Sequence, residues 1–132
     1  MFEEFNKIER PELLNPLVLA YIGDAVFEVY VRTHIAKQGN IKPNALHKAS
    51  IGFVCAKAQA NILEKIEEEL SEEELNIVRR GRNANSNTIP KNASVADYKK
   101  ATAFEALIGY LFLKNDISRL EEIVRFSIQE NN

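Results

Sequence analysis

The segment Ala20-Tyr21-Ile22-Gly23-Asp24-Ala25-Val26-Phe27-Glu28 is an apolar helical stretch with a carboxylate, Asp24, set into its middle and a second, Glu28, at its end. A second segment, Ala103-Phe104-Glu105-Ala106-Leu107-Ile108-Gly109, has the same character around Glu105. Burying a carboxylate is costly unless a cationic partner compensates its charge. If the two helices cross here, Asp24 and Glu105 face each other, and without a cation one pKa would rise sharply. We therefore expect a divalent metal between them, and hard oxygen ligands favour Mg²⁺, with Mn²⁺ as the alternative, over zinc.

Length and composition indicate one globular domain. The chain has 132 residues, enough to bury a core without disulfides, so we expect a single domain over residues 1–132 with residues 1–14 as a loosely ordered lead-in. The sequence has no apolar run of membrane-span length, and its acidic start lacks the basic region of a signal peptide, which predicts a cytoplasmic protein. The lone Cys55 is predicted to be a small core residue.

Charge is separated along the chain although the net charge is only −2. Residues 64–74 hold seven Glu and one Lys, whereas residues 79–100 hold six Lys or Arg and one Asp. A concentrated basic segment is the expected footprint of phosphate contact. The sequence therefore predicts one acidic and one basic surface, the basic one facing a nucleic acid.

Helical periodicity accounts for nearly the whole chain, and we find no strand alternation or internal repeat. Asn15 and Pro16 have the residue types of a helix start, and Gly39 of a helix end. Ser71 with Glu74, and Ser94 with Asp97, have the spacing of capping boxes. The predicted helices cover residues 16–37, 44–50, 53–70, 72–82 and 95–114, with a long polar loop at 83–92 and a left-handed cap at Asn115. A last helix is predicted to start at Asp116 or Ser118 and to carry Leu120, Ile123, Val124 and Ile128. The fold class is all-α.

Tyr-Ile-Gly-Asp-Ala-Val at 21–26, together with Phe-Glu-Ala-Leu-Ile-Gly at 104–109, resembles the ribonuclease III catalytic domain. The similarity extends from about residue 15 to residue 131, and it implies the helical bundle of the ribonuclease III endonuclease domain. We expect no double-stranded-RNA-binding domain. This short layout, with Arg-Arg-Gly-Arg-Asn-Ala at 79–84, is similar to the Mini-ribonuclease III branch, which trims precursors of large-subunit ribosomal RNA.

The resemblance implies that Asp24 and Glu105 are the catalytic, metal-binding acids. Three further acids of the family are absent, because their positions hold Leu17, Ala20 and Thr102. We therefore expect fewer protein ligands to the metal and more water in its coordination shell, which suits Mg²⁺. In phosphodiester hydrolysis such an ion orients and activates the attacking water and neutralises the leaving oxygen. Glu28 is expected to have a structural or interface role.

The basic residues are expected to grip the backbone of double-stranded RNA, because A-form RNA is recognised by its shape, its phosphates and its 2′-hydroxyls. A second strip of contacts is predicted at His47 and Lys48, with Lys57 and Gln59 beyond. The complete set of predicted RNA-binding residues is Arg79, Arg80, Arg82, Lys91, Lys99, Lys100, His47 and Lys48.

The resemblance also implies a homodimer that cuts both strands, and the first long helix, apolar nearly all round at Tyr21, Ala25 and Phe27, is the predicted two-fold contact. A large-subunit ribosomal protein is a further expected partner. Two other functions stay open at this point. One is a non-catalytic RNA-binding or ribosome-assembly factor on the same fold, suggested by the missing acids. The other is a small helical nucleotide pyrophosphatase, suggested by the glutamates of residues 64–74.

Overall fold

The computed structural model describes residues 4–5, 7–39, 42–84 and 94–130 of the chain. Every regular element in these ranges is helical, which confirms the all-α prediction. The elements are η1 (Pro11–Leu13), α1 (Pro16–Ala36), α2 (Pro43–Val54), α3 (Ala56–Ile66), η2 (Glu67–Glu69), α4 (Glu72–Asn83), α5 (Val95–Leu113) and α6 (Ile117–Glu130). None of the described helices combines the length and the apolar character that crossing a bilayer requires.

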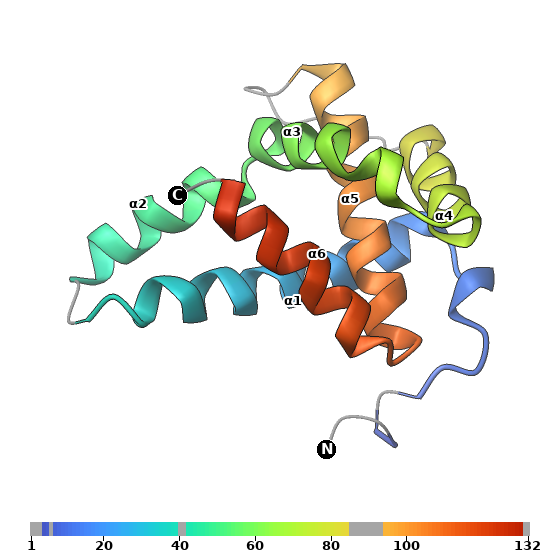
Figure 1. The fold of residues 1–132 in the computed structure, drawn as a ribbon, viewed down its shortest axis with the longest axis horizontal. Coiled ribbons are helices and arrows are strands. Elements are labelled where there is room, and N and C mark those ends of the chain that lie inside the picture. The colour runs from blue at the N-terminus through green and yellow to red at the C-terminus, as the bar shows by residue number, and fades with distance from the viewer. Residues whose placement is uncertain (1–3, 6, 40–41, 85–93, 131–132) are drawn as a thin grey trace.

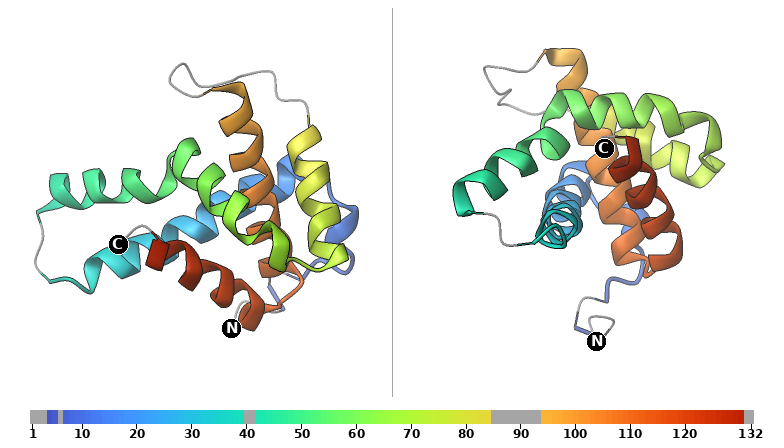
Figure 2. Two further views of the ribbon diagram at one scale, coloured as in Figure 1. Left: turned by 45° about the horizontal axis from the view of Figure 1, so that its top comes forward. Right: turned by 60° about the vertical axis from the view of Figure 1, so that its left-hand side comes forward.

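Helix α5 is the centre of the molecule. It packs against α1, α3 and α4, and α6 returns beside it, as Figures 1 and 2 show. From Ala101 to Leu111 every side chain of α5 except that of Glu105 is buried, so this helix is apolar on all sides. A helix buried all round needs neighbours on every face. The one incompletely buried position in this run is therefore the carboxylate.

The local end signals of the helices were predicted correctly in most cases. Asn15 accepts a hydrogen bond from the Leu17 amide at 2.8 Å and starts α1. Ser71 and Glu74 form a reciprocal capping box, with bonds of 2.9 and 3.1 Å, that starts α4. Asn115 ends α5 with a positive φ of 63°. These signals act between residues close in sequence, so they are readable without the tertiary structure.

The predicted boundaries between residues 42 and 56 are wrong. Helix α2 begins at Pro43, without a side-chain cap, and continues through Gly52 to Val54. The chain breaks at Cys55, which has an extended backbone and is exposed, so it is not the buried core residue that we predicted. A single glycine weakens a helix by only about 1 kcal/mol, and tertiary packing overrides that preference here. Lys91 and most of the predicted 83–92 loop lie outside the described residues.

Candidate functional site

Helices α1 and α5 approach each other unusually closely where Gly23 meets Gly109. A Cβ atom added at Gly23 would lie 1.7 Å from the backbone oxygen of Glu105 and 2.8 Å from the backbone nitrogen of Gly109. A Cβ atom added at Gly109 would lie 2.0 Å from the backbone oxygen of Leu19. Only glycine fits at such a distance, because the partner at both positions is rigid backbone. The two glycines therefore set the spacing of the helices that carry Asp24 and Glu105.

This close crossing brings the carboxyl groups of Asp24 and Glu105 into hydrogen-bonding contact. Asp24 is exposed, whereas Glu105 is partly buried, so the pair is open to solvent from the Asp24 side. Burial, the hydrogen bond and the negative charge of Asp24 together raise the pKa of Glu105 to about 9. A like charge at contact distance disfavours ionisation unless a cation neutralises it. The pair is thus an acidic site at which a bound cation would stabilise the ionised form of both carboxyl groups.

Gln59, from the first turns of α3, is the third side chain at this site. It is only 1% exposed and faces the Glu105 carboxyl group, whose pKa it lowers against the larger effects of burial and Asp24. Its Nε2 atom is buried and makes no hydrogen bond of good geometry within the described part of the chain. We had placed Gln59 in a surface strip of RNA contacts, and that interpretation is wrong. The available signal was its position one turn before the buried residues Ile62 and Leu63, as an amide on an apolar helix face.

The site provides hard oxygen ligands for a metal but few of them. Asp24 and Glu105 are carboxylates in contact, which suits Mg²⁺ or Mn²⁺ and does not suit zinc. Among the described residues, no group of three or more His, Cys, Asp and Glu side chains is arranged to hold an ion. A cation at this site would therefore have two protein anchors, and water would supply most of its ligands.

Glu28 lies near this pair, one turn after Asp24 on α1. It forms an ion pair with Arg32 at 3.1 Å, and its charge adds to the rise in the pKa of Glu105. Glu28 and Arg32 also line a pocket of about 370 Å³ between α1 and α2, together with His47 and Ser50. Glu28 therefore has an ion-pair partner on its own helix, and its charge reaches the site.

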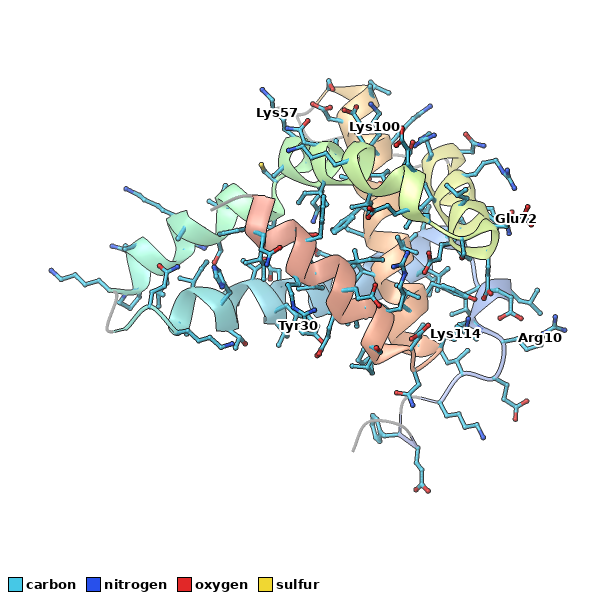
Figure 3. All side chains as sticks on the ribbon, in the orientation of Figure 1. Arg10, Tyr30, Lys57, Glu72, Lys100 and Lys114 are labelled. Atoms are coloured by element: carbon cyan, nitrogen blue, oxygen red, sulfur yellow. The ribbon has the colours of Figure 1, made fainter. Side chains whose placement is uncertain are left out.

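The predicted RNA-binding residues divide into exposed and internally bonded groups. His47, Lys48, Arg79 and Lys99 are exposed, and of these Arg79 also donates a hydrogen bond to Asn76 Oδ1 at 2.8 Å. Arg80 instead donates to the backbone oxygens of Glu12 and Leu14, at 2.6 and 2.8 Å, and so fastens the lead-in to α4. Arg82 forms an ion pair with Glu67, and Lys100 forms one with Glu64. Figure 3 shows Lys57 and Lys100 projecting from the end of the molecule where α3 and α5 begin.

Several glutamates of the acidic segment have structural partners. Besides the ion pairs of Glu64 and Glu67, Glu73 pairs with Lys114 at 3.1 Å. Glu74 is 6% exposed and accepts two hydrogen bonds from Arg119, at 2.8 and 2.9 Å. These glutamates connect α3 to α5, η2 to α4, and α4 to the end of α5 and to α6. Because they are paired with cations and do not converge on one point, the acidic segment does not form a pyrophosphatase site among the described residues.

An exposed apolar stripe runs along α1 on the surface that carries Asp24. It consists of Val18, Tyr21, Ala25 and Val29, of which Tyr21 is 79% exposed. Their spacing places them on one face of the helix. Phe27, which we had assigned to this surface, is fully buried and packs edge to face on Phe104, with ring centroids 5.1 Å apart. That assignment was wrong because a helix that is apolar nearly all round does not show which face points inward.

Comparisons with known sequences agree on one family, and a solved structure has a similar fold. The family described as "Ribonuclease III domain" matches residues 17–116. Mini-ribonuclease 3 of Brevibacillus brevis is 55% identical over 122 residues, which are 91% of this chain and 91% of that protein. Mini-ribonuclease 3 of Clostridium tetani is 51% identical over 127 residues, covering 96% of this chain and 83% of that protein. The crystal structure of a Fusobacterium nucleatum protein superposes with a TM-score of 0.85 at 31% identity, covering 95% of this chain and all of that one.

Proposed function

This chain belongs to the ribonuclease III family, and from that membership we propose that it is a metal-dependent endoribonuclease that cleaves double-stranded RNA. The observation that carries the proposal is the contact between Asp24 and Glu105 at a position open to solvent. In the ribonuclease III family a divalent cation takes part in the reaction. The two carboxylates have the ligand chemistry that such an ion prefers.

Asp24 and Glu105 are the proposed catalytic and metal-binding residues. When bound, a divalent cation such as Mg²⁺ supplies charge neutralisation and helps to orient the attacking water. Glu105 lies on the buried helix α5, which fixes the position of its carboxylate relative to the core. Asp24, exposed on α1, closes the other side of the site and faces the solvent from which RNA approaches. Burial and the neighbouring Asp24 raise the pKa of Glu105 and so favour its protonated form; because only an ionised carboxylate binds a cation, Glu105 would have to lose this proton on metal binding.

The exposed basic residues are proposed to bind the RNA backbone. His47 and Lys48 on α2 and Lys99 near the start of α5 are exposed, and Arg79 and Lys91 belong to the same proposal. Lys100 and Arg82 are also proposed contacts, since an ion pair near the surface contributes little and can be exchanged for a phosphate. Arg80 is the least suited of the set, because two backbone oxygens already occupy its guanidinium.

A homodimer is proposed for cleavage of both strands. The apolar stripe of α1 is exposed, continuous along the helix and adjacent to Asp24. A two-fold contact through this stripe would bring the two carboxylate pairs onto one surface of the dimer. Sedimentation at the concentration of the cleavage assay tests this, and a monomer there contradicts it.

We further propose that the substrate is the precursor of large-subunit (23S) ribosomal RNA, processed in the cytoplasm with the assistance of a large-subunit ribosomal protein. The similarity to the two Mini-ribonuclease 3 proteins supports the ribonuclease class of this proposal, and the target RNA extends the family resemblance seen in the sequence. A precursor transcript, offered with and without bound ribosomal proteins, tests it. Cleavage at random positions in both cases would contradict a role in ribosome maturation.

The central experiment incubates the protein with a synthetic RNA duplex and Mg²⁺, with and without a chelator. We expect cleavage that the chelator abolishes and that single-stranded RNA of the same sequence does not show. Asp24→Asn and Glu105→Gln each remove one metal-binding charge, so each should abolish cleavage without unfolding the protein. Glu68→Gln, which removes an exposed glutamate of η2, is the matched control and should cleave normally.

Full cleavage by either site variant would contradict the assignment of that residue. Duplex binding without any cleavage by the wild-type protein, across Mg²⁺ and Mn²⁺, would instead favour the non-catalytic RNA-binding factor. The same assay therefore separates the endoribonuclease from the non-catalytic RNA-binding factor.

A further inference from the structure

The Nε2 atom of Gln59 is a buried hydrogen-bond donor without a partner of good geometry among the described residues. Gln59 comes from α3 and is 1% exposed. A buried donor without a partner costs roughly 1–3 kcal/mol. A leucine or methionine of similar volume would fill the same space without that cost. An amide at this position therefore indicates a requirement that packing alone does not explain.

The neighbours of the amide indicate what that requirement is. The side chains that act on the Glu105 carboxyl group are Asp24, Glu28 and Gln59, and of these only Gln59 carries an N–H donor. An ionised carboxylate is an acceptor on both oxygens, so it must face the NH₂ group of the amide rather than its oxygen. Gln59 lies on α3, which packs against α5, and is itself buried, whereas Asp24 is exposed.

From this arrangement we propose that Gln59 is a positioning residue of the metal site: its Nε2–H donates to Glu105 and orients that carboxylate for joint ligation of the cation with Asp24. The inference rests on the proposed nuclease function and extends it to a third residue. Carboxylates that bind metals are commonly held by such hydrogen bonds, and loss of the supporting group typically weakens metal affinity or activity 10- to 100-fold. Because Asp24 and Glu105 would be the two protein ligands of the cation, misorientation of either carboxylate should weaken metal binding more than at a site with many protein ligands.

The decisive measurement is the dissociation constant of Mn²⁺ for the RNA-free protein, determined by titration calorimetry. Gln59→Met keeps the volume and removes the donor, so we expect Mn²⁺ to bind about 10- to 100-fold more weakly. Its metal-free melting temperature should stay at or above the wild-type value, because an unpartnered buried donor is gone. Ser127→Ala removes a fully buried hydroxyl of α6 away from the site and is the matched control, with unchanged Mn²⁺ affinity.

Kinetics separate positioning from general damage. In Gln59→Met the Mn²⁺ concentration required for half-maximal cleavage should rise by the same factor as the dissociation constant, while KM for the duplex stays unchanged. Saturating Mn²⁺ should restore most of kcat. If Gln59→Met binds Mn²⁺ as tightly as the wild type, the inference is overturned.

Wild-type protein provides a test that needs no folded variant. The side-chain amide resonances of Gln59 should shift, and their exchange with water should slow, when Mg²⁺ is added. Resonances that stay in place at saturating Mg²⁺ overturn the inference.

Asp24→Asn distinguishes the role of Gln59 from the existence of the metal site. If Asp24→Asn loses Mn²⁺ binding and Gln59→Met does not, only the role of Gln59 fails. If Asp24→Asn binds Mn²⁺ as tightly as the wild type, both the proposed metal site at Asp24 and Glu105 and the role of Gln59 are contradicted.

Discussion

Replacing Gly23 with alanine should disable the site without touching either carboxylate. The new Cβ atom would lie 1.7 Å from the Glu105 backbone oxygen, whereas an ordinary contact between carbon and oxygen is roughly 3.3–3.6 Å. The helices must therefore separate by roughly 1.5–2 Å at this point. Ligand distances to Mg²⁺ are about 2.0–2.1 Å with little tolerance, so Asp24 and Glu105 would no longer bind one ion together. A misplacement of about 1 Å is enough to lower a rate about 100-fold.

The stability change follows from the same contact. Overpacking against a rigid neighbour costs about 1–3 kcal/mol, and the higher helix propensity of alanine returns less than about 1 kcal/mol of that. For a chain of this length, 1 kcal/mol corresponds to about 4 °C in Tm. We expect Gly23→Ala to fold with the wild-type circular dichroism spectrum, to melt about 4–8 °C lower, and to lose about 100-fold or more in kcat/KM on an RNA duplex.

Gly52→Ala is the matched control for this experiment. Gly52 lies inside α2, and a Cβ atom added there would meet no atom within 4 Å. The substitution should leave cleavage unchanged and raise stability by about 0.5–1 kcal/mol through helix propensity alone. Wild-type kcat/KM and Tm in Gly23→Ala would refute the idea that this close crossing sets the geometry of the site.

Three further predictions concern pH, packing and RNA. The pKa of Glu105 is raised from 4.5 to about 9 in the metal-free folded state. Between these two pH values the folded protein keeps a proton on Glu105 that the unfolded chain releases. The free energy of unfolding should therefore fall as pH rises from 4.5 to 9. Urea unfolding without metal should show this loss in the wild type, on the order of a few kcal/mol, and show it greatly reduced in Glu105→Gln. Arg119→Met deprives the buried Glu74 of two hydrogen bonds and should cost about 3 kcal/mol in thermal unfolding, whereas Arg125→Met, exposed on the same helix, should be neutral. The double variant Lys48→Ala with Lys99→Ala should lower duplex affinity equally for all RNA sequences. It should also reduce the slope of log affinity against log salt concentration by about one for each phosphate that is no longer neutralised. Lys7→Ala, in the lead-in, is the control and should change neither the affinity nor the slope.

Much of the fold was predictable because its signals are local. Asn15, the Ser71 capping box and Asn115 act on backbone groups within a few residues, so their types and spacing define helix ends without tertiary information. The break at Cys55 was missed because neither side of it carries a side-chain cap. The positions of Asp24 and Glu105 were predictable for a similar reason, since a single acid inside an apolar helical stretch is conspicuous.

The sequence by itself determined the all-α class, most helix ends, the family and the two acids of the proposed site. Only the tertiary structure decided that Asp24 and Glu105 touch, that Gln59 points inward beside them, and that Arg80 holds the lead-in rather than facing solvent. It also decided that Phe27 is core and Tyr21 is surface. The physical reason is that such facts depend on which helix faces pack together, and that depends on steric fit between segments far apart in the chain. Two glycines, Gly23 and Gly109, permit the approach of α1 and α5 that brings the carboxylates into contact.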